Sequence, residues 1–186
     1  MLDEIERLKK RVYKAFAVRQ ECLKILAQCT GAKRELYRKK FQILNEKYWV
    51  LQEKLDYLDS ELIASDNEIE IRKNSHNIDS MYGIYLKNTG LKVGHIDYRG
   101  YHDSLISGDI GYVIDNKYNG HNYAYKALCL LSSYLHENNI SDFYISAFKD
   151  NYPSIKIIEN YGGGIIREDD RMITYQCNTR GKDYKI

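Results

Sequence analysis

Apolar side chains recur in the first third of the chain at alternating intervals of three and four residues, the spacing of a coiled-coil seam. The clearer seam consists of Phe41, Leu44, Tyr48, Leu51, Leu55, Leu58 and Leu62. A weaker seam, interrupted by Arg19, consists of Leu2, Ile5, Leu8, Val12, Ala15, Cys22, Leu26 and Cys29. Thr30 and Gly31, between the two seams, form a natural helix end and turn. The pattern predicts two long helices, over about residues 3–29 and 32–64, folded back as a coiled-coil hairpin.

Residues 66–186 show a different pattern, in which short strand-like stretches alternate with turn signals and two helical stretches. Asn88-Thr89-Gly90 indicates a β-hairpin, and Asn151 with Pro153 indicates a helix start. The predicted strands cover residues 68–72, 81–87, 91–98, 109–115, 142–148, 165–168 and 172–177, and the predicted helices begin at Asn122 and Asn151. This order predicts an α+β domain over residues 66–186, preceded by the helical hairpin over residues 1–65.

Composition and cysteine spacing exclude several classes of protein. The 28 Lys and Arg residues against 26 Asp and Glu leave a formal net charge of +2, too even for a DNA-coating protein. No apolar run is long enough for a membrane helix, and the charged N-terminus lacks the apolar core of a secretory signal. The four cysteines (Cys22, Cys29, Cys129 and Cys177) and the histidines show no metal-binding spacing. We therefore expect buried thiols, no metal and a cytoplasmic location.

Basic residues outnumber acidic ones in residues 1–65, and the reverse holds in residues 66–186. A basic run lies at the predicted bend of the hairpin and consists of Lys33, Arg34, Arg38, Lys39 and Lys40. A solvated helix face accounts for such a run, and an arm that binds RNA or a protein is the alternative. The seams also allow a homo-oligomer or a protein partner through residues 1–65.

The stretch from Ile110 to Ala124 carries the first candidate chemistry, because a buried strand leads through a short loop into a helix start. Unpaired N–H groups and the helix dipole make such a place suitable for phosphate. Gly120 allows close approach of a ligand to the backbone, and Asn122 tolerates a left-handed conformation. Lys117, His121 and Lys126 could add donors or positive charge.

A second block follows, in which Asn151 and Ser154 begin a helix and Glu159 and Gly162 end it. With both blocks, residues 67–178 resemble the GNAT superfamily of acetyl-CoA-dependent N-acetyltransferases. The family's pyrophosphate signature, Arg/Gln-x-x-Gly-x-Gly/Ala, falls here on residues 119–124, with Asn119 and Asn122 in place of the family's Arg/Gln and Gly. The resemblance implies a mixed, mostly antiparallel GNAT-like sheet with two helices. The family's two helices between its first two strands have no room here, because only eight residues separate Arg72 from Met81.

The resemblance also implies acetyl-CoA as co-substrate and assigns the residues that bind it. In the family, the strand before the signature pairs its backbone with the pantetheine amides. The implied binding residues are Tyr112, Val113, Ile114, Asn119, Gly120, His121, Asn122, Tyr123, Ala124, Asn151 and Ser154.

Transfer to an amine requires a base, since an alkylammonium with a pKa of about 10.4 must lose a proton before it attacks. Family members often carry an acid at the position of Asp109, which makes it the candidate base, with His95, Asp97 and Asp103 as alternatives. The family's tyrosine that protonates the leaving thiolate falls on Ile158, so Ser154 is the candidate donor to the sulfur.

The sequence therefore predicts a cytoplasmic acetyl-CoA-dependent N-acetyltransferase acting on an unidentified small-molecule or peptide amine by direct transfer. The acceptor site is expected along residues 91–98 and 100–108, lined by Asp97, Tyr101, His102 and Asp103. Two alternatives stay open, a CoA-binding module without catalysis and a protein that binds RNA or a partner through its hairpin. Membrane and nucleic acid are not the expected partners.

Overall fold

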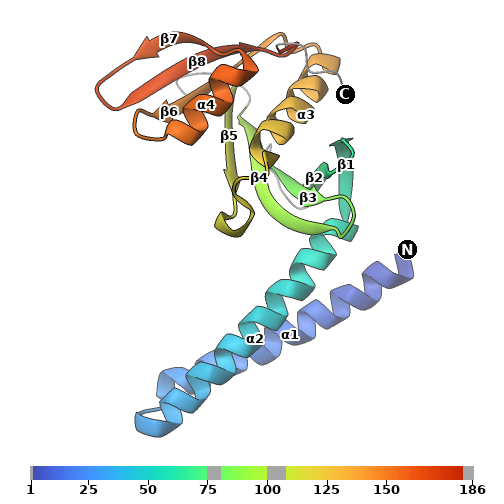
Figure 1. Ribbon diagram of the computed structural model, residues 1–186. Helices are drawn as coiled ribbons and strands as arrows, with labels where there is room; N and C mark the ends of the chain where they lie inside the picture. Colours follow the sequence, from blue (N-terminus) through green and yellow to red (C-terminus); the bar gives the residue numbers. More distant parts are fainter. Residues whose placement is uncertain (1, 75–80, 100–107, 182–186) are drawn as a thin grey trace. The chain divides into compact units, whose positions relative to one another are not determined.

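The structure, a computed structural model, describes residues 2–74, 81–99 and 108–181 (Figure 1). The described contacts divide the chain into two compact units, Met1–Asp59 and Ser60–Ile186. The division falls a few residues before the predicted boundary at 65/66, and the hairpin and the acetyltransferase-like region remain predicted domains.

The first unit consists of two packed helices, α1 (Leu2–Gln28) and α2 (Gly31–Leu58), which confirms the predicted pair. Their shared core contains Ile5, Leu8, Val12 and Leu55, with Tyr48, Leu51 and Leu58 packed against it. The positive φ of 56° at Gly31 allows the turn between the helices. Because the structure shows packing rather than supercoiling, the coiled coil stays a prediction.

Arg19, which interrupts the weaker seam, is held by polar and aromatic partners on α2. Its Nε donates to Asn45 Oδ1 at 2.6 Å, and its Cζ lies 5.4 Å from the ring centroids of both Phe41 and Tyr48. Cation–π contacts of this kind favour Arg beside aromatic rings. A charged side chain is therefore accommodated in the seam without breaking the helix pair.

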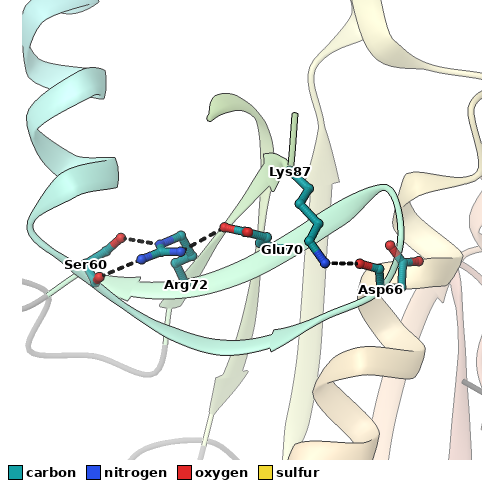
Figure 2. Close-up of polar contacts among 5 residues, drawn as sticks. All are labelled: Ser60, Asp66, Glu70, Arg72 and Lys87. Atoms are coloured by element: carbon teal, nitrogen blue, oxygen red, sulfur yellow. Dashed lines mark hydrogen bonds and ion pairs between the residues drawn. The ribbon is translucent and has the colours of Figure 1, made fainter. Parts of the chain in front are cut away.

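The predicted end of the second helix at residue 64 is wrong, because α2 ends at Leu58 and Ser60–Ser65 form strand β1. Leu62, which continued the heptad pattern, is 47% exposed on this strand. β1 pairs with β2 (Ile69–Asn74), and Arg72 of β2 donates to Ser60 Oγ at 2.9 Å and Ser60 O at 3.1 Å (Figure 2). Leu62 therefore has the spacing expected of a helix, but pairing of β1 with β2 places it on a strand instead.

The second unit is built on one eight-stranded sheet, within the residues that the structure describes. Its remaining elements are β3 (Met81–Leu86), β4 (Leu91–Arg99), β5 (Asp109–Ile114), the 3-10 helix η1 (Asn116–Tyr118), α3 (Tyr123–Glu137), β6 (Asp142–Phe148), α4 (Tyr152–Tyr161), β7 (Gly164–Glu168) and β8 (Met172–Asn178). The strand order is β1-β2-β3-β4-β5-β6-β8-β7, and the β5–β6 pair is parallel while the others are antiparallel. The predicted mixed, mostly antiparallel fold is confirmed, with β1 as an additional edge strand.

Helices α3 and α4 contact each other and contribute to one core with the sheet (Figure 1). Leu128 of α3, Ile158 of α4 and Ile96 of β4 are fully buried in this core. Cys129 and Cys177 lie there too, and burial raises the pKa of each thiol to about 12. The expected buried thiols are confirmed, and a neutral thiol at this depth is not a nucleophile.

Truncating Leu128 to alanine should lower the free energy of unfolding by about 2–5 kcal/mol, because it leaves a cavity in the packed core. Urea denaturation followed by circular dichroism measures the loss. Leu91→Ala is the control in the same unit, since this side chain is 39% exposed and its removal should cost about 0.5 kcal/mol. Equal losses in the two variants would contradict the position of the core.

Candidate active site

The parallel strands β5 and β6 part at Asp109. Among the described residues, the two strands pair at one position, where Asp109 of β5 lies beside Tyr144 of β6. Tyr144 N donates a hydrogen bond to Gly108 O at 2.9 Å. Beyond this point β5 continues to Ile114 beside β4, while its other edge has no strand paired with it in the part of the chain that the structure describes. Unpaired strand edges can pair with an extended ligand.

The loop after β5 takes the conformations that the sequence predicts for a phosphate site. Gly120 has a φ of 85° and Asn122 a left-handed φ of 63° immediately before α3. A side chain built on Gly120 would meet no atom within 4 Å, so the backbone there is open. The Asn122 side chain makes no capping hydrogen bond to the first turn of α3. This helix therefore lacks a side-chain cap from its N-cap residue, at the end where an anion is favoured.

Helix α4 begins differently, with its own cap. Asn151 Oδ1 accepts a hydrogen bond from Ser154 N at 3.3 Å, and Pro153 occupies the first turn. The capping role predicted for Asn151 is confirmed. Tyr112 of β5 reaches the same turn, where its hydroxyl donates to Ser154 O at 3.4 Å.

Strand β5, the loop that leads into α3 and the first turns of α4 surround a cleft of about 680 Å³. Its lining residues are Tyr112, Ile114, Tyr118, Asn119, Gly120, Asn122, Tyr123, Ala124, Asn151, Pro153, Ser154, Lys156, Ile157 and Asn160. Most of the predicted binding residues are thus brought together around one space. Val113 is absent from the lining and 52% exposed, because alternate residues of a strand point to opposite faces. His121 stacks on Tyr123 at 5.3 Å between ring centroids.

The structure also adds residues that the motifs missed, chiefly Lys156 and Asn160 on α4. Lys156 and Asn160 are four positions apart, as are Pro153 and Ile157, so all four lie on one face of the helix. This spacing could have identified them from the sequence. Lys156 is the cationic side chain among the described residues that line the cleft.

The lysines proposed from sequence as phosphate contacts have other partners. Lys126 Nζ lies 2.7 Å from Glu68 Oε1 and 3.9 Å from Asp66 Oδ2, so it ties α3 to the turn between β1 and β2. A further lysine, Lys87, which was not among those proposed, donates from its Nζ to the backbone oxygen of Asp66 at 2.9 Å in the same turn (Figure 2). Lys117 Nζ lies 4.8 Å from the ring centroid of Tyr118.

Asp109 lies where β5 and β6 part. It is on the face of the sheet opposite Tyr112, since the two are three positions apart along the strand. Its register partner on β4 is Arg99, whose Nε donates to Asp97 Oδ2 at 2.8 Å. Burial raises the pKa of Asp109, and Asp97 raises it further, while the Arg99 charge opposes the rise. A side chain on Gly111 would lie 2.7 Å from Asp97 Oδ1, so it would displace the Asp97 carboxylate from its present position.

The tyrosines near the cleft differ in whether they could donate a proton to the leaving thiolate. Ile158, at the family's tyrosine position, is fully buried, and Tyr161 is buried with its hydroxyl donating to Ser132 Oγ at 2.7 Å. Tyr152 is 74% exposed and does not line the cleft. Tyr112 does line it, and burial raises the pKa of its phenol to about 12, so it is protonated at neutral pH.

The predicted acceptor residues are described only in part. Asp97 lies beside Arg99, and His95 is the register partner of Val113. Tyr101, His102 and Asp103 lie outside the described residues. Among the residues that are described, no cluster of three or more His, Cys, Asp or Glu could hold a metal ion.

Comparison with known protein families identifies the class to which this fold belongs. A family profile described as "Acetyltransferase (GNAT) domain" matches residues 39–163, two thirds of the chain, and the chain belongs to this family. The match starts within α2, earlier than the resemblance in residues 67–178. The GNAT family generally uses acetyl-CoA.

Solved structures of several acetyltransferases are similar to this chain. A GNAT-family acetyltransferase from Bacillus anthracis is 20% identical over 54% of this chain and 67% of its own, with a TM-score of 0.49. RimL, a ribosomal L7/L12 alpha-N-protein acetyltransferase, is 16% identical over 64% of this chain and 94% of its own, with a TM-score of 0.51. An acetyltransferase from Agrobacterium tumefaciens str. C58 is 22% identical over 52% of this chain and 58% of its own, with a TM-score of 0.45.

At 16% identity the likeness to RimL shows the fold alone, and the chain spans less than two thirds of the Agrobacterium protein. No curated protein matched the sequence. Within the described residues, no helix is both long and apolar enough to cross a bilayer.

Proposed function

We propose that the protein transfers the acetyl group of acetyl-CoA to the nitrogen of an amine, which is a small molecule or a peptide. The observation that supports this most is the meeting of three features at one cleft: the open edge of β5, the start of α3 without a side-chain cap, and the polar face of α4. Each suits one part of a long, phosphate-bearing thioester.

The pyrophosphate of acetyl-CoA would lie against the backbone of residues 119–124, where the helix dipole of α3 favours negative charge. Asn119 gives no positive charge here, and Lys156 on the facing wall supplies it instead. The pantetheine amides would pair with the open backbone edge of Tyr112, Val113 and Ile114, for which the outward side chain of Val113 is no obstacle.

The chemistry proceeds at the point where β5 and β6 part. The neutral amine nitrogen attacks the thioester carbonyl carbon, the C–S bond breaks, and the nitrogen's surplus proton passes to the Asp109 carboxylate directly or through water. Ser154 Oγ donates a hydrogen bond to the departing thiolate. The protonated phenol of Tyr112 becomes a second donor when its one proton turns from the Ser154 carbonyl oxygen to the sulfur. The pKa of Asp109, raised by burial, suits a base better than that of a free carboxylate.

The acceptor amine is unidentified, and the fold suggests which class to test first. RimL, which shares the fold, is by its name an acetyltransferase of a protein α-amine, so peptide N-termini belong in the first set of acceptors to test. A cytoplasmic location and association through residues 1–65 also remain proposals from sequence.

The test is thiol release from acetyl-CoA by the full chain in the presence of short peptides and polyamines, with mass spectrometry of the products. We expect one class of amine to gain one acetyl group in place of one hydrogen, in step with thiol release. Acetyl-CoA binding without thiol release for any amine would instead favour the non-catalytic CoA module, consistent with Ile158 at the tyrosine position.

The acidic limb of the rate profile should move when the charges around Asp109 change. Arg99 and Asp97 of β4 face this carboxyl, and Tyr144 is its register partner on β6. Arg99→Gln removes the charge that lowers the Asp109 pKa, so loss of kcat/KM on acidification should begin at higher pH. Asp97→Asn removes a charge that raises the same pKa, so the loss should begin at lower pH. Shifts of the same sign in both variants would contradict Asp109 as the base.

A further inference from the structure

Helix α2 carries a second row of regularly spaced side chains, separate from the row that packs on α1. This basic–apolar row consists of Lys33, Leu36, Lys40, Ile43, Lys47, Val50 and Lys54, at alternating intervals of three and four residues. Such spacing keeps all seven on one side of a helix. The residues that pack on α1 form a different row, centred on Leu55 with Tyr48 and Leu51.

The apolar members of this row are open to solvent. Leu36 is 65% exposed, Ile43 is 53% exposed and Val50 is 66% exposed. Successive members are seven residues apart, which is about 10 Å along the helix, so they form a line of about 21 Å. Scattered exposed aliphatic residues are normal, but three in one straight line form a surface that a partner can cover.

The lysines of the row are largely uncompensated. Lys33, Lys40 and Lys47 form no ion pair with any carboxylate in the part of the chain that the structure describes. Lys54 has one long contact, 4.0 Å to Glu4 Oε1, and Lys40 Nζ lies 5.6 Å from the ring centroid of Tyr37. The row therefore presents positive charge at every second position and an aliphatic side chain at the positions between.

We propose that the basic–apolar row is a docking surface for an acidic amphipathic helix of a partner protein. Such a helix would place leucine-like side chains against Leu36, Ile43 and Val50 and carboxylates against the lysines. The lysines of the row call for carboxylates on the partner, and the aliphatic residues between them call for apolar side chains at the same helical spacing. The proposal does not depend on the acetyl transfer proposed above.

Other occupants fit the row less well. RNA would neutralise the lysines but leave the aliphatic side chains uncovered, because these cannot stack with bases as aromatic rings do. An anionic membrane is a broad surface and would meet Glu46 and Glu53 as well, which are exposed and lie beside Val50 at helical spacing, whereas a single helix needs to cover only the row. A second copy of the same row would bring lysine against lysine.

The test measures binding of the full chain to a labelled helical peptide of four heptads, with leucine along one face and glutamate on both flanks. The same peptide with lysine for glutamate is the matched probe. We expect the acidic peptide to bind at low salt, the basic peptide to bind at least tenfold more weakly, and affinity to fall as salt rises.

Two sets of variants locate the site. Leu36→Ser with Ile43→Ser and Val50→Ser, and separately Lys40→Glu with Lys47→Glu, should each weaken binding at least tenfold. Val18→Ser with Leu23→Ser on α1, which are 45% and 41% exposed and outside the row, should leave it unchanged. Circular dichroism confirms that each variant keeps its helices.

Several outcomes would overturn the proposal. These are failure of the acidic peptide to bind, binding that neither set of row variants weakens, and equal binding of the two peptides. A duplex RNA, or vesicles containing anionic phospholipid, that bound more tightly than the acidic peptide would also overturn it, in favour of that partner.

Discussion

Replacing Gly120 by glutamate is expected to weaken acetyl-CoA binding at least about 100-fold, which corresponds to about 2.8 kcal/mol. The new carboxylate would stand in the open space above the loop, where the pyrophosphate is expected. Two like charges about 4 Å apart repel by about 4 kcal/mol at an effective dielectric constant of about 20. Isothermal titration calorimetry of acetyl-CoA into wild type and variant measures the difference.

Gly120→Ala is the matched control, because both substitutions place a side chain on a residue with a φ of 85°. The alanine variant shares the backbone strain without the negative charge, so it should lose much less affinity than the glutamate variant. Equal affinity of the wild type and the glutamate variant would show that the phosphates lie elsewhere. An equal loss in both variants would assign the effect to backbone strain.

Replacing Asp109 by asparagine should lower kcat about 10²–10⁴-fold while the Kd for acetyl-CoA stays unchanged. Asparagine keeps the shape of the side chain but cannot accept the amine proton. Asp109 does not line the cleft, so the thioester should still bind. Asp142→Asn, at the start of β6, is the matched control and should retain activity. The Asp142 carboxylate accepts hydrogen bonds from the side chains of Ser141 and Asn178 and has no assigned role in proton transfer.

The Asp109→Asn variant should be more stable than wild type at neutral pH. The pKa of Asp109 is raised in the folded state above the ordinary value of 3.8, so the ionised carboxyl disfavours folding. This penalty grows as pH rises from the unfolded pKa through the folded pKa and is complete above it. Asparagine removes the penalty. A variant with full activity, or with reduced stability at neutral pH and lost acetyl-CoA binding, would contradict the assigned role.

Local sequence signals predicted much of the fold because each depends on a few adjacent residues. The turn at Asn88-Thr89-Gly90 forms with Gly90 at a φ of 66°, and α4 ends at Gly162 with a φ of 108°. The left-handed conformation of Asn122 was likewise predictable from the residue type. Such positions accept few residue types, so the sequence identifies them directly.

Features that depend on distant parts of the chain were not predictable in the same way. The end of α2 at Leu58 depends on pairing of β1 with β2, which no heptad pattern reveals. Lys126 was grouped with the phosphate site by sequence proximity, but the turn between β1 and β2 holds it. Lys156 lines the cleft only because α4 packs opposite the loop that begins α3.

The most direct test of the central claim is to follow the backbone amide signals of the isotope-labelled full chain by nuclear magnetic resonance as acetyl-CoA is added. We expect the largest shifts at residues 119–124, with further changes at Tyr112, Ile114 and Lys156. Changes confined to residues 2–58, or no changes at millimolar acetyl-CoA, would contradict an acetyl-CoA site in this cleft.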